Sequence, residues 1–223
     1  MNSAELPAYQ HVLDGKQVNL PVGKIVCIGR NYAEHARELN NPIPTEPLLF
    51  IKPATTVVPI APTFSIPMDR GSCHFETELA ILVGERLSNA DESQAEKAIL
   101  GVGVALDLTL RDVQQQLKEK GQPWEKAKAF DGACPLSEFV SFDGDLQNLE
   151  FSLIQNGEVR QQVNTSDMLT PVLKLMAYIS GHFTLMPGDV VLTGTPAGVG
   201  PLAVGDSLCA ELTGLVRAES TVR

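Results

Sequence analysis

The chain has 223 residues, of which 43% are hydrophobic and 20% are charged, and this is the composition of an ordinary globular protein. Asp and Glu number 27 against 17 Lys and Arg, so the formal net charge of −10 argues against nucleic-acid partners and anionic membrane surfaces. No apolar run approaches the roughly 20 residues that cross a membrane, and residues 1–7 lack the basic and apolar parts of a secretory signal.

The length predicts a single catalytic domain over residues 1–223, with residues 1–20 forming an appended N-terminal strand or hairpin. The cysteines lie far apart and none forms a C-x-x-C pair, which argues against a zinc ribbon or a dithiol redox site. We therefore expect reduced thiols and a cytoplasmic location. The four cysteines are Cys27, Cys73, Cys134 and Cys209.

Short segments rich in β-branched residues, punctuated by Gly and Pro, predict many strands and few helices. The pair Asn156-Gly157 separates two of these segments and predicts a hairpin, because both central positions of a type I′ turn need positive φ. The expected strands cover residues 24–28, 48–52, 75–83, 101–108, 150–155, 158–162, 189–192, 207–211 and 215–222.

The helices are predicted from their end signals. Ser88 or Asn89 is a candidate N-cap of a helix over residues 91–100, and Thr109 is a candidate N-cap of a helix over 109–120. Thr170 would cap a helix over 171–180, which Gly181 would end. Runs of strands are interrupted by single helices and do not alternate as βαβα, so the predicted class is α+β with a mixed or antiparallel sheet. The four helices are expected at residues 33–39, 91–100, 109–120 and 171–180.

Residues 29–38 follow a predicted strand and contain His35 and Glu38 three positions apart on the first helix. At this spacing the Glu38 carboxylate can orient the His35 imidazole. The pair is therefore a candidate general base for a carbon acid or a water molecule. A surface ion pair is the alternative interpretation.

Two glutamates lie on an unusual face of the strand expected at residues 75–83. Alternate residues of a strand share a face, and the face that carries Glu76 and Glu78 continues into Ala80 and Leu82. Two carboxylates that lead into an apolar region repel each other unless a cation lies between them. The alternative is that both acids lie on a solvated face.

The strand expected at residues 101–108 has one apolar face and one face of small residues that ends at Asp107. Small residues let another backbone or a ligand come close. A buried carboxylate needs a metal ion or a lysine as its partner. The alternative for Asp107 is a favourable negative charge at the N-terminus of the helix that follows it. Glu76, Glu78 and Asp107 would supply three oxygen ligands, which suit Mg²⁺ or Mn²⁺. A zinc site that uses His74 with the two glutamates is the alternative.

Further polar groups could converge on this site. Arg111 and Gln114 share one face of the helix after Asp107, where Arg111 could hold a substrate carboxylate. Lys128 has small and apolar neighbours and could stabilise a developing enolate. The turn after the strand at 189–192 is rich in glycine and hydroxyls and allows close approach of a ligand. The alternatives are a surface arginine, an exposed lysine and a tight structural turn.

Together these motifs resemble the fumarylacetoacetate hydrolase family, in its short single-domain branch. An E-x-E, an L-D-x-T-x-R-D and a T-G-T-P motif occur in this order, and the resemblance spans about residues 24–196. The matching segments are residues 29–38, 48–53, 74–79, 106–112, 121–128 and 192–196.

The resemblance implies a β-rich mixed-sheet roll, a homodimer and a divalent metal held by Glu76, Glu78 and Asp107. It also implies that His35 and Glu38 lie on a lid that orders when substrate binds. Members of the family hydrolyse acylpyruvates, decarboxylate oxaloacetate, or tautomerise and isomerise related diacids. The candidate substrate-binding residues are Arg30, Arg111, Gln114, Lys128 and Thr195.

The expected function is therefore Mg²⁺-dependent chemistry on small 2-oxo acids through a metal-bound enolate, with Lys128 beside the developing charge. His35 and Glu38 would move the proton or activate water. One alternative is an isomerase of 2-hydroxymuconate-type diacids. Another is a metal-stabilised domain that binds a carboxylate without catalysis, although such a domain would need neither Lys128 nor the His35/Glu38 pair.

Overall fold

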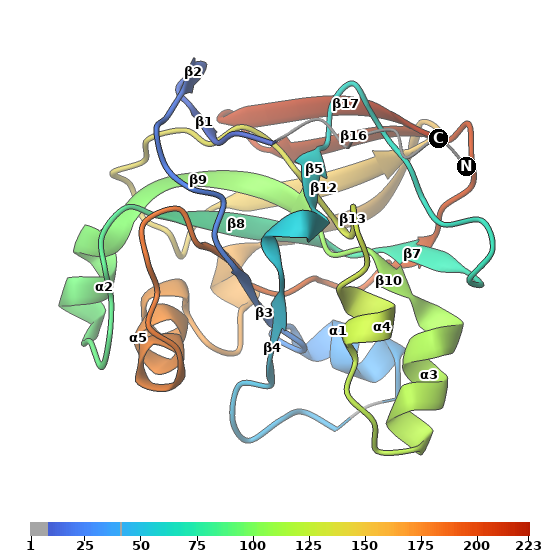
Figure 1. Cartoon of the computed structure of the whole chain (residues 1–223), viewed down its shortest axis with the longest axis horizontal. Coiled ribbons are helices and arrows are strands. Elements are labelled where there is room, and N and C mark those ends of the chain that lie inside the picture. The colour runs from blue at the N-terminus through green and yellow to red at the C-terminus, as the bar shows by residue number, and fades with distance from the viewer. Residues whose placement is uncertain (1–8, 41) are drawn as a thin grey trace.

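The computed structural model of the chain describes residues 9–40 and 42–223. Two large β-sheets pack against each other, and the helices stand at the periphery in two groups, α2 with α5 and α1 with α3 and α4 (Figure 1). Within these residues, none of the helices combines the length and apolar character that a membrane crossing requires. The helices are α1 (Ala33–Glu38), α2 (Glu92–Ala98), α3 (Arg111–Glu119), α4 (Glu125–Lys128) and α5 (Val172–His182), with 3-10 turns at Ala54–Thr56 and Thr165–Asp167.

The larger sheet has seven strands in the order β4-β3-β14-β8-β9-β11-β5. β14 runs parallel to β3 and β11 runs parallel to β5, whereas the remaining neighbours are antiparallel, so the sheet is mixed. In that order the strands are Leu49–Lys52, Ile25–Ile28, Val190–Leu192, Thr77–Val83, Ile99–Leu106, Cys134–Leu136 and Val57–Pro59.

The second sheet has five strands in the order β13-β12-β16-β17-β6, antiparallel except where β6 joins β17. These strands are Glu158–Asn164, Glu150–Gln155, Ser207–Leu212, Val216–Val222 and Thr63–Phe64. A three-stranded sheet contains β10 (Thr109–Leu110), β7 (Cys73–Phe75) and β15 (Gly200–Pro201), and a hairpin contains β1 (Val12–Leu13) and β2 (Lys16–Gln17).

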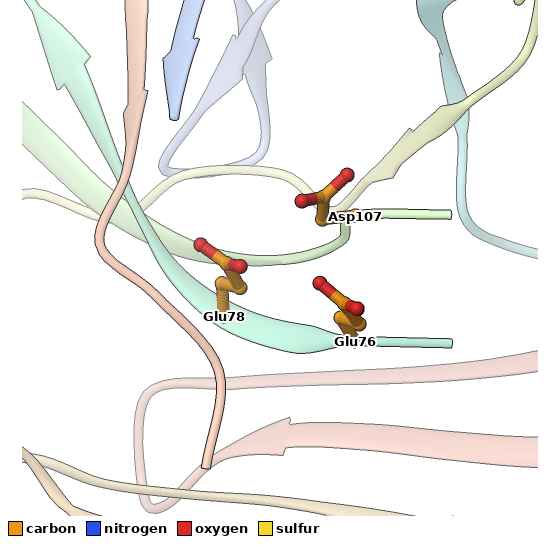
Figure 2. Close-up of side chains that lie close together, drawn as sticks. All are labelled: Glu76, Glu78 and Asp107. Carbon is orange, nitrogen blue, oxygen red and sulfur yellow. The ribbon is translucent and has the colours of Figure 1, made fainter. Parts of the chain in front are cut away.

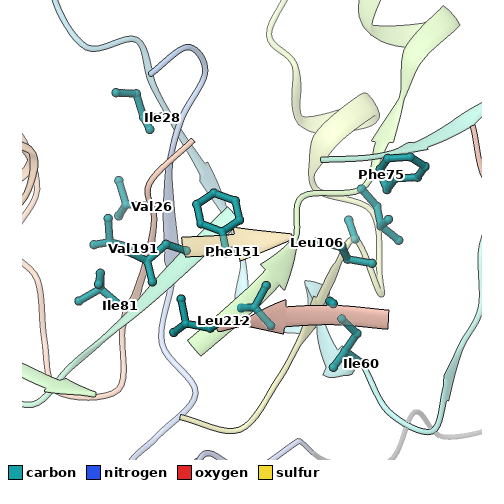
Figure 3. Packing of buried hydrophobic residues seen from close by; sticks show 14 of the residues in the cluster. Val26, Ile28, Ile60, Phe75, Ile81, Leu106, Phe151, Val191 and Leu212 are labelled. Carbon is teal, nitrogen blue, oxygen red and sulfur yellow. The ribbon is translucent and has the colours of Figure 1, made fainter. Parts of the chain in front are cut away.

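One hydrophobic core joins the two large sheets. Phe151 and Leu212 of the second sheet face Ile81, Leu106 and Val191 of the first in a single buried cluster (Figure 3). Burial of such side chains is the main stabilising contribution to a fold of this kind. The acid-bearing strand β8 lies in the middle of this core, with all seven of its residues buried.

The predicted α+β class with a mixed sheet is confirmed, and so is the turn at Asn156-Gly157, where φ is 53° and 84°. All four cysteines are free thiols. Sequence reasoning did not predict α4 or five of the strands, since these elements are short and their pairing partners lie far away in the chain. The missed strands are β5, β6, β10, β11 and β15.

Three of the four predicted helices have wrong ends. The second helix is capped by Asp91, whose side chain accepts from the N–H of Gln94, and the chain enters β9 directly after Ala98. Thr109 does not cap the third helix, because it pairs with β7 and the helix begins two residues later. The fourth predicted helix, α5, continues through Gly181, and the side chain of Gln147 rather than that of Thr170 accepts from its first N–H.

The small-residue face of β9 receives another part of the backbone rather than a ligand. A Cβ atom built on Gly103 would lie 2.8 Å from the carbonyl oxygen of Glu138, and one on Gly101 would lie 2.9 Å from that of Val140. This close approach is held by reciprocal hydrogen bonds between Val102 and Val140, both 2.9 Å long.

Gly103→Ala should therefore lower the free energy of unfolding by about 1–3 kcal/mol, the usual cost of overpacking a core. Gly181→Ala is the matched control, because a Cβ there meets no atom within 4 Å and Ala favours a helix. Urea unfolding of both variants measures the difference. Equal stability of Gly103→Ala and the wild type would contradict this, because it would show that residues 137–140 can move away from the added methyl group without cost.

Candidate functional site

Three buried carboxylates meet where β8 and β9 pair. Glu76 precedes β8, Glu78 lies opposite Ala105 of β9, and Asp107 follows β9, with its N–H donating 2.8 Å to the carbonyl of Glu76. Their side chains point toward one another (Figure 2). One oxygen from each lies within 4.8 Å of the others, and none of the three residues is more than 5% exposed. The face predicted from strand alternation is therefore not solvated.

Basic side chains compensate two of these acids. Lys128 Nζ lies 2.8 Å from Glu76 Oε2 and 2.7 Å from Asp107 Oδ2, and Arg111 donates to Glu76 Oε1. Burial alone would raise the pKa of Glu76, but Lys128 and Arg111 outweigh it and hold that pKa well below its usual range. Burial opposes the charge of Lys128, yet Asp107 and Glu76 raise its pKa above the ordinary lysine value.

Glu78 is the acid that lacks a basic partner. Its Oε2 accepts from the Gly194 N–H at 2.6 Å, and within the described ranges it forms no ion pair. Burial and the charges of Asp107 and Glu76 raise its pKa well above the usual range. A cation close to all three carboxylates would remove this repulsion, so the residues fit a metal ion.

The donor set is three carboxylates, which suits a hard divalent cation such as Mg²⁺ or Mn²⁺. The structure therefore brings together the three residues that could hold a metal. Among residues 9–40 and 42–223, His74 is not part of this group, which argues against the zinc alternative. His74 instead lies in β7 opposite Thr109, where burial and the charge of Arg111 lower its pKa.

A small cavity of about 20 Å³ is lined by Glu76, one of the three acids, and by Lys128, which contacts both Glu76 and Asp107. It has room for about one water molecule, so a 2-oxo acid can enter only if the surrounding groups move. Four of the lining side chains are basic, which favours an anionic ligand. The lining residues are Gly29, Arg30, His35, Leu39, Glu76, Arg111, Gln114, Lys118, Trp124 and Lys128.

The structure thus gathers four of the five predicted substrate-binding residues around one cavity. Arg111 and Gln114 come from the first two turns of α3, where Arg111 Nη1 donates 2.8 Å to Gln114 Oε1. Thr195 is the exception and is not among the lining residues. Its hydroxyl donates to the carbonyl of Thr77 at 2.9 Å and accepts from Gln161 at 2.8 Å, so its hydrogen points at β8.

His35 and Glu38 form the predicted pair on α1, with 3.3 Å between His35 Nδ1 and Glu38 Oε2. A carboxylate only accepts, so Nδ1 donates and Nε2 carries the lone pair. Burial lowers the pKa of His35 despite the opposing charges of Glu76 and Glu38, so the imidazole is neutral at neutral pH. Gly198 N–H donates 3.0 Å to Glu38 Oε1 and ties α1 to the loop after β14.

A larger pocket of about 400 Å³ lies beside this cavity and shares Trp124 and Lys128 with it. Its walls are mainly apolar, and they come from β4 and from the segment that leads into α4. The pocket gives the site a neighbouring volume large enough for a small organic molecule. The remaining lining residues are Leu48, Leu49, Phe50, Ile51, Gln122, Pro123, Glu125 and Phe183.

Sequence reasoning assigned no role to Lys52, the last residue of β4. Its side chain is fully buried, with Nζ 2.8 Å from Asp107 Oδ1 and 3.0 Å from the carbonyl of Ala133. It also donates to the carbonyl of Lys128. A buried lysine is rarely tolerated without a charged partner, so the run of apolar residues before Lys52 was the available sign.

Residues 24–223 match the family described as fumarylacetoacetate (FAA) hydrolase C-terminal, and the chain belongs to this family. It is 54% identical to the oxaloacetate tautomerase YcgM of Escherichia coli, over 92% of this chain and 96% of that protein. It is 42% identical to the mitochondrial oxaloacetate tautomerase FAHD1 of Bos taurus, over 86% and 88%.

A solved structure extends the comparison. The chain superposes on the fumarylpyruvate hydrolase of Pseudomonas aeruginosa, solved in complex with Mn²⁺ and pyruvate, with a TM-score of 0.90 and 35% identity. The match covers 96% of this chain and 95% of that one.

Each of the substitutions Glu76→Gln, Glu78→Gln and Asp107→Asn removes one charged oxygen ligand. Each should raise the Kd for Mg²⁺ or Mn²⁺ at least about 10-fold, because loss of a residue that only supports a metal ligand already weakens metal binding by about that factor. Calorimetric titration with either ion measures this, and the exposed Glu219→Gln is the control. Full turnover by enzyme that has been stripped rigorously of metal would refute the site.

Proposed function

We propose that this chain, as a member of the fumarylacetoacetate hydrolase family, catalyses the keto–enol tautomerisation of oxaloacetate with Mg²⁺ or Mn²⁺ as its cofactor. The observation that carries the proposal is the arrangement of the three carboxylates beside a cavity with four basic side chains. The carboxylates can hold a divalent cation. The basic side chains match a substrate that carries two carboxylates.

The relatives support this choice of substrate and cofactor. Two of them are named as oxaloacetate tautomerases, and a third was solved with Mn²⁺ and with pyruvate, which is a 2-oxo acid. A cation in the acid cluster would act as a Lewis acid and favour loss of a proton from the carbon next to the 2-oxo group.

Substrate binding falls to the basic side chains of the cavity. Arg111 can hold a carboxylate through two parallel hydrogen bonds, and Gln114 fixes the plane of its guanidinium. Arg30 and Lys118 lie on the same cavity and suit the second carboxylate. Lys128 keeps its charge in this buried site, and it stabilises the negative charge that develops on the 2-oxo oxygen.

Proton transfer falls to His35. In the keto form, His35 Nε2 accepts a proton from C3, the C3 electrons form the C2–C3 double bond, and the 2-oxo oxygen gains the charge. Return of a proton to that oxygen gives the enol, and the reverse sequence gives the ketone. Glu38 holds His35 in the tautomer that leaves Nε2 free to accept. Opening of α1 as a lid that admits the substrate stays a prediction, and the small cavity volume supports it.

The second candidate function is hydrolysis of an acylpyruvate, with His35 activating a water molecule. The apolar pocket of about 400 Å³ beside Lys128 favours it, because that pocket could hold an acyl group. Decarboxylation of oxaloacetate and isomerisation of a 2-hydroxymuconate-type diacid would use the same residues and begin with the same enolate.

We further propose a homodimer that works in the cytoplasm. The four free cysteines support a reducing compartment. β4 lies at the edge of the larger sheet and carries the half-buried Leu49, Phe50 and Ile51, and an apolar sheet edge of this kind is suited to being covered.

A panel of 2-oxo acids with Mg²⁺ tests the proposed function. Interconversion of enol and keto oxaloacetate, followed by the absorbance of the enol, should be accelerated most. Cleavage of acylpyruvates, followed by their products, should be slower. Rapid acylpyruvate cleavage without any acceleration of tautomerisation would instead establish the second candidate.

His35→Ala should reduce acylpyruvate hydrolysis by about 10²–10⁴-fold, the usual contribution of a general base. Tautomerisation should fall less, because Lys128 still stabilises the enolate and C3 can lose its proton to solvent. Lys128→Ala should damage both reactions, and Lys126→Ala, an exposed lysine on the same helix, should damage neither. Intact hydrolysis by His35→Ala together with abolished tautomerisation would contradict the water-activating role.

A further inference from the structure

Gln161 is a buried amide that connects the second sheet to the acid-bearing strand. It lies on β13, is 1% exposed, and both the oxygen and the nitrogen of its amide are hydrogen-bonded. Its Oε1 accepts from the Thr77 N–H at 2.9 Å, and its Nε2 donates to Thr195 Oγ1 at 2.8 Å and to the carbonyl of Pro196 at 2.9 Å. An N–H on one side and a carbonyl on the other fix the orientation of the amide.

These bonds close a ring around one residue of β8. Thr195 Oγ1, which accepts from Gln161, donates 2.9 Å to the carbonyl of Thr77, while Thr77 N–H donates to Gln161. Both main-chain groups of Thr77 are therefore held by side chains. In such a buried ring each hydrogen bond polarises the next, and removal of one member leaves the others unsatisfied.

The position of Thr77 gives the ring its importance. Thr77 lies between Glu76 and Glu78, whose side chains rise on the same side of the backbone (Figure 2). The strand is interrupted at Glu76, since β7 ends one residue before it and β8 begins one residue after it. On the β9 side this backbone is held by the pairing of Thr77 with Leu106 and by the Asp107 N–H on the Glu76 carbonyl. On its other side, where the pairing with β14 begins only at Ala80, the Gln161 ring holds the backbone that sets the separation of two of the three carboxylates.

At Thr195 the ring adjoins the main-chain donor that contacts Glu78. Thr195 follows Gly194, whose N–H donates to Glu78 at 2.6 Å. Gly194 has a φ of +97°, and a Cβ there would lie 2.6 Å from the Cβ of Asn31, so this turn has little freedom. Gln161 therefore fixes the position of the Gly194–Pro196 turn relative to β8. It thereby also fixes the Gly194 N–H that donates to Glu78.

We propose that Gln161 is a positioning residue of the metal site, which acts through Thr77 and Thr195 on the geometry of Glu76 and Glu78. The inference rests on the proposed function in one respect, namely that the acids hold a divalent cation. The ring also commits the Thr195 hydroxyl hydrogen to Thr77, so Thr195 can meet a substrate only through its main-chain N–H or an oxygen lone pair.

Gln161→Met tests this, because methionine is close to glutamine in size and cannot take part in the ring. Calorimetric titration with MnCl₂, at a temperature where circular dichroism shows a native fold, should give a Kd about 10-fold higher than that of the wild type. Thr195→Val removes the hydroxyl from the same ring and should also raise the Kd severalfold. It keeps the test decisive if Gln161→Met does not fold.

The double variant should bind Mn²⁺ about as weakly as the weaker single variant, because both substitutions break one ring. Gln162→Met is the control, since Gln162 is the exposed neighbour on β13 and its side chain donates to Glu150, outside the ring. A lower melting temperature with an unchanged Kd in both single variants would overturn the positioning role and leave the proposed function intact. Absence of Mn²⁺ binding by the wild type would overturn both.

Discussion

Repulsion among three buried carboxylates is the constraint on which the rest of the site depends. Glu76, Glu78 and Asp107 offer oxygens within 4.8 Å of one another, away from water. At an effective dielectric constant of 20, two unit charges at this separation repel by about 3 kcal/mol. Lys128, Arg111 and Lys52 compensate Glu76 and Asp107, and Glu78 keeps only a main-chain N–H. This imbalance makes a divalent cation the natural partner of the cluster.

The fold brings the compensating groups from distant parts of the chain. Lys52 comes from the edge strand β4, Lys128 from the one-turn helix α4 and Arg111 from the start of α3. The second sheet contributes Gln161, and the loop after β14 contributes the Gly194 N–H. A cluster of this kind needs support from all sides, because each buried polar group without a partner costs stability. The close packing of the two large sheets therefore serves the chemistry of the site.

Local sequence patterns were enough to predict the acids and two polar pairs, of which His35 with Glu38 is one. Strand alternation identified Glu76 and Glu78, the end of a small-residue strand identified Asp107, and helical spacing paired Arg111 with Gln114. These patterns can be recognised in the sequence because each depends on residues only a few positions apart.

Contacts between distant residues could not be predicted in the same way. Lys52 meets Asp107 across 55 positions of sequence, and Gln161 meets Thr77 across 84, so no local spacing reveals either contact. Thr109 does not cap the third helix as its residue type predicts, because pairing with His74 of β7 overrides its capping preference. The direction of the Thr195 hydroxyl likewise depends on a residue of the other sheet.

The most direct measurement is anomalous X-ray scattering from crystals of the protein grown with Mn²⁺. We expect one anomalous peak, from an ion bonded to oxygens of Glu76, Glu78 and Asp107 at about 2.0–2.6 Å, the range of bonds between hard cations and oxygen. Crystals with excess Mn²⁺ that show no peak among these carboxylates, and still show Lys128 bridging Glu76 and Asp107, would contradict this expectation.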